Sequence, residues 1–220
     1  MHCHVKTWGA IHQKSVKSTS VNSALYVLYN VLGKRRGEVN AMEKLIITAC
    51  ICGAEVTKEH NPAVPYTVEE IAKEAKSAYD AGASIIHLHV REDDGTPTQS
   101  KERFEASINA IKEVCPDVII QPSTGGAVGM SNEERLAPTT LRPERATLDC
   151  GTCNFGGDEI FVNTENMIID FANTMNEYGI KPEIEVFDKG MVDMAIRLHK
   201  KGYIKTPNDF DFVMGVSGGI

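Results

Sequence analysis

Residues 82–95 read Gly-Ala-Ser-Ile-Ile-His-Leu-His-Val-Arg-Glu-Asp-Asp-Gly, and this stretch decides the fold. The run from Ile85 to Val90 has the length of a strand and is apolar except for two histidines. A charged loop, Arg91–Gly95, follows it directly. Near-continuous apolar strands are typical of parallel sheets that are covered on both faces. The stretch therefore predicts one β/α unit of such a sheet, with polar residues at the end of the strand.

The same pattern recurs along the chain from Met42 onward. Five further apolar runs of strand length are Leu45–Cys50, Val118–Gln121, Ala146–Asp149, Pro182–Phe187 and Phe210–Met214. Amphipathic helical segments separate most of them, and six β/α units in series imply a parallel sheet covered by helices. An open doubly wound sheet usually binds its ligand at one switch point. Here polar residues follow nearly every strand, which favours an α/β fold of the (β/α)8 TIM barrel type.

Two of the intervening helices have clear boundary signals. Thr67 and Glu70 have the spacing of a capping box, and the helix that they begin is expected to end at Gly82. Asn163 or Thr164 can cap a helix that runs to Tyr178 and that Gly179 ends. A complete barrel of this type takes about 250 residues, so we expect this chain to be truncated after about six units.

The first 41 residues have a different character. Residues 1–41 are basic and rich in serine, with no acidic residue before Glu38 and no sustained hydrophobic period. The segment Lys34–Val39 can be encoded by a purine-rich stretch that resembles a bacterial ribosome-binding site, just upstream of Met42. We therefore interpret residues 1–41 as a non-native, unstructured leader, and residues 42–220 as the N-terminal part of the barrel. An N-terminal extension of the native protein is the alternative.

Composition excludes several classes of function. A net charge of −7 argues against nucleic acid or an anionic membrane as the partner, and no apolar run reaches the roughly 20 residues that span a bilayer. The six cysteines lie in a chain too long for a disulfide scaffold, so we expect a reducing, cytoplasmic compartment. The Cys150-x-x-Cys153 pair has no second pair beside it, so a redox or zinc role is not favoured.

The His87-Leu88-His89 motif gives the sharpest chemical signal. Residues i and i+2 of a strand point to the same face, so both imidazoles aim at one place. Two neutral imidazoles at this spacing suit a divalent metal, most plausibly zinc. Two histidines held by hydrogen bonds inside a barrel are the structural alternative.

Two further patterns could form binding sites. Ser123-Thr124-Gly125-Gly126 follows a predicted strand, and its exposed backbone N–H groups could hold a carboxylate or phosphate, although such a turn needs no ligand. Glu55 and Glu185 are acids beside apolar strands that could together hold a substrate ammonium. From spacing alone, solvent-facing glutamates are the better interpretation of these two.

A resemblance adds to these patterns. The chain resembles the β-keto acid cleavage enzyme family in six motifs that occur in order: GAEVTKE (53–59), GASIIHLHVREDDG (82–95), IIQPSTGGAVG (119–129), RPERATLDCGTCNFG (142–156), PEIEVFDKGMVD (182–193) and FVMGVSGG (212–219). The resemblance covers the chain from Met42 to Ile220. It implies that His87 and His89 bind Zn²⁺.

The resemblance also implies substrate contacts. Ser123, Gly126 and Thr147 would contact the β-keto acid, and Glu55 would meet a substrate amino group with help from Glu185. The family usually has Asn where this chain has Asp149, which leaves that contact open. The third zinc ligand, a glutamate, and the aspartate that acts as general base are expected beyond Ile220, so no catalytic residue is identifiable and this chain is expected to be inactive alone.

The implied reaction uses acetyl-CoA as co-substrate. Zinc would act on the 3-keto oxygen, a carbon nucleophile made from acetyl-CoA would add to the ketone, and cleavage would release acetoacetate and an acyl-CoA. The expected substrate is 3-keto-5-aminohexanoate, an intermediate of lysine fermentation, and the expected acyl-CoA is 3-aminobutyryl-CoA. Cleavage of another β-keto acid, or an inactive barrel fragment, is the alternative. Relatives suggest a homotetramer.

Two rival functions were considered. A metal-dependent hydrolase barrel also uses His-x-His, but it needs further histidines on later strands, and only His199 follows, on a predicted helix. A non-catalytic subunit or binding module is the rival from another class. Zinc content and CoA-dependent formation of acetoacetate would separate these possibilities.

Overall fold

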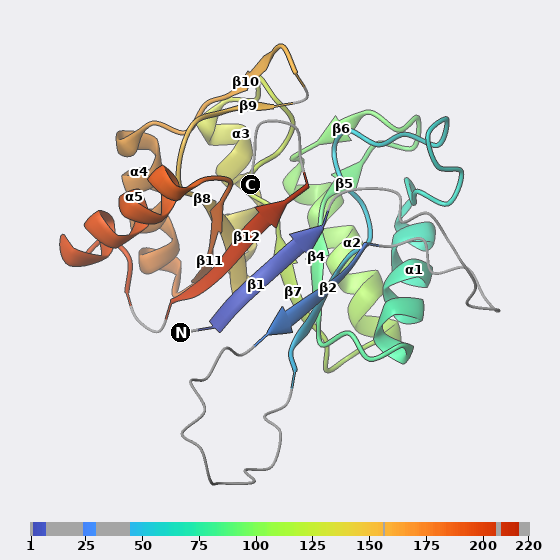
Figure 1. The fold of residues 1–220 in the computed structure, drawn as a ribbon. Coiled ribbons are helices and arrows are strands. Elements are labelled where there is room, and N and C mark those ends of the chain that lie inside the picture. The colour runs from blue at the N-terminus through green and yellow to red at the C-terminus, as the bar shows by residue number, and fades with distance from the viewer. Residues whose placement is uncertain (1, 8–23, 30–44, 156, 206–207, 216–220) are drawn as a thin grey trace, which may run out of the picture.

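The computed structural model describes residues 2–7, 24–29, 45–155, 157–205 and 208–215, the first two segments in backbone only. The chain has a mixed α/β fold in which an eight-stranded sheet lies inside a layer of helices (Figure 1). The strands of the sheet are β1 (His2–Thr7), β2 (Ala24–Tyr29), β3 (Ile47–Cys50), β4 (Ile85–Leu88), β7 (Ile119–Pro122), β8 (Arg145–Asp149), β11 (Lys181–Val186) and β12 (Asp209–Met214).

The six predicted strands are confirmed, with boundaries shifted by one or two residues. β3, β4 and β7 are parallel neighbours, and so are β8, β11 and β12. The complete order is β7-β4-β3-β2-β1-β12-β11-β8. β7 and β8 stand at the two ends of this order, yet Thr124, just after β7, donates from its hydroxyl to the Thr147 carbonyl of β8 at 2.7 Å. The two ends of the sheet therefore meet.

The predicted leader falls largely outside the described residues. Within residues 1–41 the structure describes β1, which is parallel to β12, and β2, which is antiparallel to both β1 and β3. These two segments differ from the expectation of an unstructured leader, because they fill the sheet between β12 and β3. The interpretation of residues 1–41 as non-native stays a prediction.

Within the described residues, five α-helices and one 3-10 helix lie outside the sheet. They are α1 (Val68–Asp80), α2 (Lys101–Val114), α3 (Asn132–Leu136), η1 (Ala137–Leu141), α4 (Glu165–Tyr178) and α5 (Lys189–Lys200). Thr67 caps α1 in the predicted capping box with Glu70, and Gly179 ends α4 with a φ of 73°. The chain also contains the short strands β5 (Val90–Arg91), β6 (Pro97–Thr98), β9 (Cys153–Phe155) and β10 (Glu159–Phe161).

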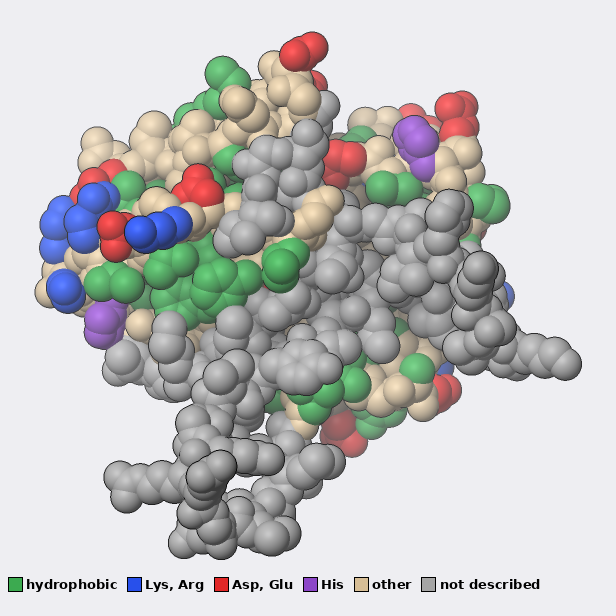
Figure 2. All heavy atoms as spheres, viewed as in Figure 1, with side chains coloured by type: hydrophobic (Ala, Val, Ile, Leu, Met, Phe, Trp, Pro, Cys, Tyr) green, Lys and Arg blue, Asp and Glu red, His purple; other side chains and the backbone are tan. Residues whose placement is uncertain are grey.

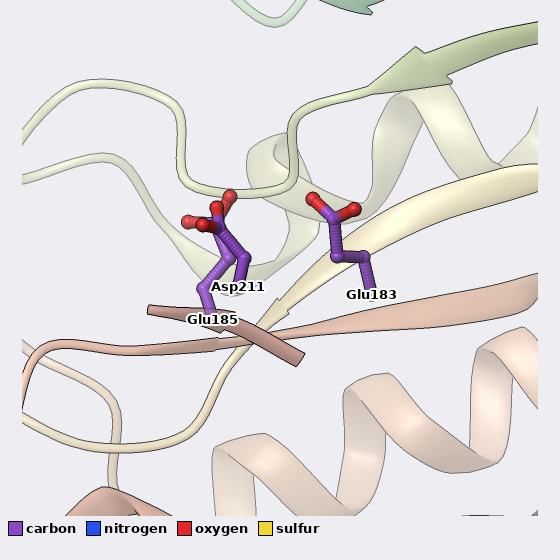
Figure 3. A group of neighbouring side chains, drawn as sticks. All are labelled: Glu183, Glu185 and Asp211. Atoms are coloured by element: carbon purple, nitrogen blue, oxygen red, sulfur yellow. The ribbon is translucent and has the colours of Figure 1, made fainter. Parts of the chain in front are cut away.

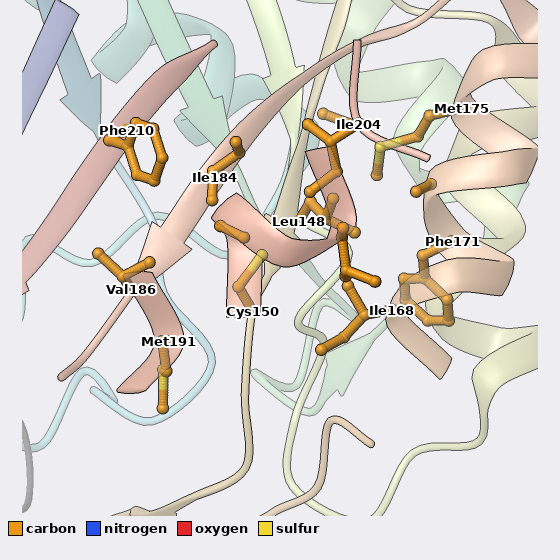
Figure 4. Close-up of a cluster of buried hydrophobic side chains, with 14 of the residues drawn as sticks. Leu148, Cys150, Ile168, Phe171, Met175, Ile184, Val186, Met191, Ile204 and Phe210 are labelled. Atoms are coloured by element: carbon orange, nitrogen blue, oxygen red, sulfur yellow. The ribbon is translucent and has the colours of Figure 1, made fainter. Parts of the chain in front are cut away.

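Two apolar cores lie between the sheet and its helices. One packs Ile86 and Leu88 against Ile71 and Phe104 of α1 and α2. The other packs Leu148 and Ile184 against α4 and α5 (Figure 4). This layer uses every second residue of a strand, so the alternate residues face the inside of the sheet. The polar side chains of the strands are therefore concentrated inside.

The outer surface of the described part is mixed in charge. Over α4 and α5, basic and acidic side chains lie close together on the face shown in Figure 2. In this region of the chain Arg197 and Lys201 both pair with Glu165. None of the described helices is long and apolar enough to cross a membrane.

Candidate active site

The His87-x-His89 pair lies at the carboxyl end of β4, and its geometry follows from the strand. The two ring centroids are 5.1 Å apart, so both imidazoles occupy the same side, while Leu88 is fully buried among apolar residues on the other. His87 is 5% exposed. Its Nδ1 lies 3.2 Å from Oε1 of Gln121 on the neighbouring strand β7. A proton on Nδ1 that is donated to this oxygen places the lone pair on Nε2, which is the arrangement found for metal-binding histidines.

The turn Ser123–Gly126 follows β7 directly and is anchored on both sides. The Ser123 amide donates to the Leu88 carbonyl of β4 at 2.9 Å, and the Thr124 amide donates to Oγ1 of Thr147 at 3.0 Å. Gly126 has a φ of 65°, and a Cβ there would lie 2.8 Å from the Met130 sulfur. The positive φ favours glycine at this position, and any Cβ there would also displace the Met130 side chain.

One open pocket of about 510 Å³ collects almost all of the predicted site residues. It lies at the carboxyl ends of the parallel strands, where active sites of such folds occur. Its lining comprises Glu55, His87, His89, Ser123, Gly125, Gly126, Val128, Asp149, Phe155, Phe161, Glu185, Phe187 and Val213. Thr147 is not part of this lining, because its side chain faces the Thr124 amide instead. The sequence prediction of its substrate contact therefore has no direct geometric support.

The acidic residues of the pocket stand on two sides. Glu185 of β11 is 8% exposed and lies beside Glu183 and Asp211, whose carboxylates point to the same side of the sheet (Figure 3). Glu55 lies in the loop after β3 and has an exposed surface. Burial nevertheless raises the pKa of Glu55, because protein surrounds its carboxyl at the mouth, although nearby Arg91 lowers it. Glu55 and Glu185 thus bring two carboxyl groups to the same pocket.

Sequence reasoning missed several residues that build the site. Phe155, Phe161 and Phe187 form an apolar wall, and the first two come from the β9–β10 hairpin. Gln121 supports His87, and its only sequence signal was a polar residue inside an apolar strand. Hairpins this short carry no clear periodicity, so the wall could not be predicted.

Two buried arginines support the pocket from behind and also escaped prediction. Arg135 of α3 is 3% exposed and donates to the Thr124 carbonyl at 2.7 Å and to Oδ1 of Asn163 at 2.7 Å. One of its nitrogens lies 3.6 Å from the Asp149 carboxylate. Arg91 is 1% exposed and donates to carbonyls on both sides of Glu55. An arginine in a polar segment of sequence is normally expected to lie on the surface. The burial of Arg91 and Arg135 is therefore visible only in the folded structure.

The cysteine pair has no chemical role in this arrangement. Cys150 is fully buried, and burial raises the pKa of its thiol far above the usual range. Burial also raises the pKa of Cys153, to about 11. Both thiols are therefore harder to deprotonate than a free cysteine.

The donor set fits zinc in kind. Neutral imidazoles are preferred zinc ligands, and the Gln121 contact holds one of them in the required tautomer. Among the described residues, the group of three or more metal-ligating side chains within 4.8 Å of one another is Glu183, Glu185 and Asp211. This group contains only carboxylates, and Glu183 pairs with Arg145 at 3.5 Å. The imidazoles match the ligand type preferred by zinc more closely than this acidic cluster does.

Comparisons with known proteins agree with the motifs. The chain is 79% identical over 179 residues to the 3-keto-5-aminohexanoate cleavage enzyme of Acetoanaerobium sticklandii, a match that covers 81% of this chain and 66% of that relative. The corresponding enzyme of Fusobacterium nucleatum is 78% identical, with 80% and 64% covered. A 3-oxoadipate:acetyl-CoA acetyltransferase of Cupriavidus necator is 38% identical, with 80% and 61% covered. The chain thus spans just under two thirds of the length of these relatives.

Solved structures give the same fold. A structure of apo ObcA matches 68% of this chain and 36% of that chain with a TM-score of 0.60 at 23% identity, which shows similarity of fold alone. A sequence model described as beta-keto acid cleavage enzyme matches residues 44–220. The predicted resemblance is confirmed: this chain belongs to the β-keto acid cleavage enzyme family.

Proposed function

We propose that this chain carries the zinc-binding and substrate-binding part of an enzyme that cleaves a β-keto acid with acetyl-CoA. The observation that carries the proposal is the pocket itself, where the two imidazoles and the acidic residues line one cavity. The preferred substrate is 3-keto-5-aminohexanoate, because two relatives at 78–79% identity bear that name. The products are acetoacetate and 3-aminobutyryl-CoA, formed in the cytoplasm during lysine fermentation.

The fold that supports this function is the first six units of a (β/α)8 barrel, formed by β3, β4, β7, β8, β11 and β12; β2, which is antiparallel to both its neighbours, is not such a unit. Two sets of three parallel strands and the Thr124–Thr147 bonds between the ends of the sheet favour a closed arrangement over an open one. The pocket at the carboxyl ends of the strands is where a barrel places its ligand. A homo-oligomer is the expected assembly, as in many enzymes of this size.

His87 and His89 would hold the zinc ion in this pocket. When bound there, zinc would supply Lewis-acid chemistry to a substrate keto group. Ser123 and Gly126 would contact the substrate carboxylate. The amides of Ser123, Thr124 and Gly125 already donate within the protein, so the Ser123 hydroxyl and the Gly126 amide are the donors proposed for it. Phe155, Phe161 and Phe187 give the pocket an apolar wall.

The amino group of the substrate would lie near Glu55 and Glu185. Both carboxylates line the pocket, and the charge of an ammonium complements theirs. A charge-assisted hydrogen bond contributes roughly 1.5–3 kcal/mol, which is enough to select an amino acid substrate over a neutral one. This charge selection is the reason to prefer an amino-β-keto acid over other β-keto acids.

The balance of atoms corrects the direction of attack expected from the sequence. Acetoacetate contains an acetyl group bonded to a CH₂–COO⁻ unit, and the keto acid supplies that unit as C1 and C2. A base must therefore remove a proton from C2, and the C2 carbanion attacks the carbonyl carbon of acetyl-CoA and expels the CoA thiolate. The thiolate then attacks C3, the C2–C3 bond breaks with its electrons left on C2, and C2 takes back the proton that the base removed. Acetoacetate and 3-aminobutyryl-CoA leave. No general base is assigned among the described residues.

The test combines metal analysis with an acetoacetate assay. It uses the 220-residue chain and a chimera in which the chain is joined to the part of the Acetoanaerobium relative that it does not match. We expect one zinc per chain and acetyl-CoA-dependent acetoacetate in the chimera, both lost in His87→Ala/His89→Ala. A chimera that binds zinc but gives no acetoacetate with any β-keto acid would favour a non-catalytic role.

A further inference from the structure

We propose that Arg91 is a positioning residue that fixes Glu55 relative to His87 and His89, and so determines the preference for amino-β-keto acids. This inference rests on the proposed function, because it concerns how the same pocket selects its substrate. Arg91 itself does not line the pocket.

The guanidinium of Arg91 donates hydrogen bonds to backbone carbonyls on both sides of Glu55. Its Nε and Nη2 donate to the Gly53 carbonyl at 3.0 and 2.6 Å, and Nη2 also donates to the Val56 carbonyl at 2.9 Å. Residues 51–56 form neither helix nor strand, so the sheet does not fix their path. The side chain of Arg91 therefore supplies the restraint that a hydrogen-bond ladder would otherwise give.

The other end of this restraint is the strand that carries the imidazoles. Arg91 follows His89 by two residues and belongs to β5, which continues directly from β4. One side chain thus connects the metal-binding segment to the loop of Glu55 across 38 residues of sequence. The separation between a carbonyl held near the imidazoles and an ammonium held by Glu55 depends on this connection.

Arg91 is itself held rigidly. Its Nη1 donates to the Gly95 carbonyl at 2.7 Å, its guanidinium carbon lies 5.4 Å from the centre of the Tyr66 ring, and its own carbonyl accepts from Nε of Arg103 at 2.7 Å. The side chain is 1% exposed, so these contacts are made away from solvent. A lysine could keep the charge but could not reach carbonyls in several directions at once, because it lacks the planar fork of arginine.

The test compares two substrates of equal chain length, 3-keto-5-aminohexanoate and 3-oxohexanoate. In the chimera defined above, we expect Arg91→Lys to lower kcat/KM for the amino substrate about ten- to a hundredfold more than for the neutral one. Glu55→Gln should have the same selective effect. The double variant should lose little further selectivity, because both changes remove one interaction.

Arg135→Lys is the matched control, since Arg135 is an equally buried arginine that holds the 123–126 turn instead. It should lower kcat/KM for both substrates to a similar degree. Equal losses on both substrates for Arg91→Lys, or additive losses in the double variant, would overturn the role of Arg91. Loss of zinc from Arg91→Lys would also contradict it, because the imidazoles should stay in place.

Amide hydrogen exchange on the 220-residue chain supplies a readout that does not need turnover. Arg91→Lys should speed exchange at Ala54 and Glu55, whereas Arg135→Lys should speed it at Thr124 and Gly125. Unchanged exchange at Ala54 and Glu55 would overturn the inference even if the chain cleaves its substrate. Faster exchange there, without turnover of either substrate by the wild-type chimera, would mean that only the proposed function fails.

Discussion

The two halves of the sheet place very different side chains in the same interior. The half made of β3, β4 and β7 contributes imidazoles and an amide, represented by His87 and Gln121. The half made of β8, β11 and β12 contributes charged groups: Arg145, Glu183, Glu185, Asp209 and Asp211. Both halves bury the same kind of apolar layer under their helices. The difference between them therefore concerns chemistry, since the packing is alike.

This contrast separates two tasks. The first half offers lone pairs to a metal without burying a net charge. The second half buries several carboxylates, and Arg145 and Lys181 offset part of that charge through contacts with Asp209 at 2.7 and 2.8 Å. Buried charge is tolerated only with such partners, so the second half should be far more sensitive to loss of one group.

Arg145→Met should produce the largest effect. Removing one partner of a buried ion pair costs about 3–5 kcal/mol, because Asp209 and Glu183 would keep their charge with less compensation. The free energy of unfolding from urea denaturation measures it. Thr48→Val is the control in the first half, where a 2% exposed hydroxyl makes no hydrogen bond and its loss should change little. Equal losses of unfolding free energy in Arg145→Met and Thr48→Val would show that the two halves of the sheet do not differ in this sensitivity.

Gln121→Leu should weaken zinc binding about 10- to 100-fold, because an outer partner of a ligating histidine fixes its tautomer and orientation. Competition with a chromophoric chelator measures the affinity. Gln99→Leu provides the comparison: this buried glutamine donates to the Ser123 carbonyl at 3.0 Å rather than to an imidazole. Its loss should leave zinc affinity unchanged and weaken only substrate binding. Similar zinc affinities in both variants would show that Gln121 does not support the metal.

Acid should destabilise the second half through Asp209. Burial raises the pKa of Asp209, but hydrogen bonds from Lys181 and Arg145 outweigh it, so the pKa lies below its usual range. A lowered carboxyl pKa adds stability above the unfolded value of about 3.9, and this stability is lost as pH falls through the folded pKa. Asp209→Asn should therefore be less stable than wild type at pH 7, and the two should converge below about pH 4. Parallel stability curves from pH 7 to 3 would contradict this, and Glu183 is the neighbouring acid to replace next.

The smallest effect concerns the helices that cover the two halves. Thr67→Ala should cost about 1 kcal/mol, because it removes the capping box at the start of α1. Thr164→Ala at α4 should cost less, since the Thr164 side chain accepts a single bond at 3.4 Å. Thermal melts of both variants measure the difference, with Thr67→Ser as the conservative control. A larger loss at Thr164 would reverse the order.

The sequence predicted the regular part of the fold because each signal there is local. Thr67, Glu70 and Gly179 act within one turn of helix, and the alternation around His87 and His89 needs only strand geometry. These features can be recognised in the sequence without knowing which segments pack against them in the fold. The six parallel strands and the imidazole pair could therefore be predicted from the periodicity of apolar residues along the sequence.

The remainder of the site depends on contacts between distant segments. Arg135 joins residues 124, 149 and 163, and nothing near it in sequence marks it as buried. Thr147 has a family motif around it, yet its hydroxyl is used by the Thr124 amide. The motifs therefore indicate that these residues lie near the pocket, whereas the contacts of each side chain depend on how the distant segments pack.

The Thr124–Thr147 contact has a consequence for protein engineering. Among the described strands, β7 and β8 are joined by these side-chain bonds and not by a ladder, and each flank of the junction has its own apolar core. The turn at residues 127–130 beside it is partly exposed. A break in that turn would separate the polypeptide into two pieces with complementary halves of the pocket. The junction is therefore the natural place to design a split protein in which the pocket, with His87 and His89 on one side and Asp149 and Glu185 on the other, is complete only when the pieces reassemble.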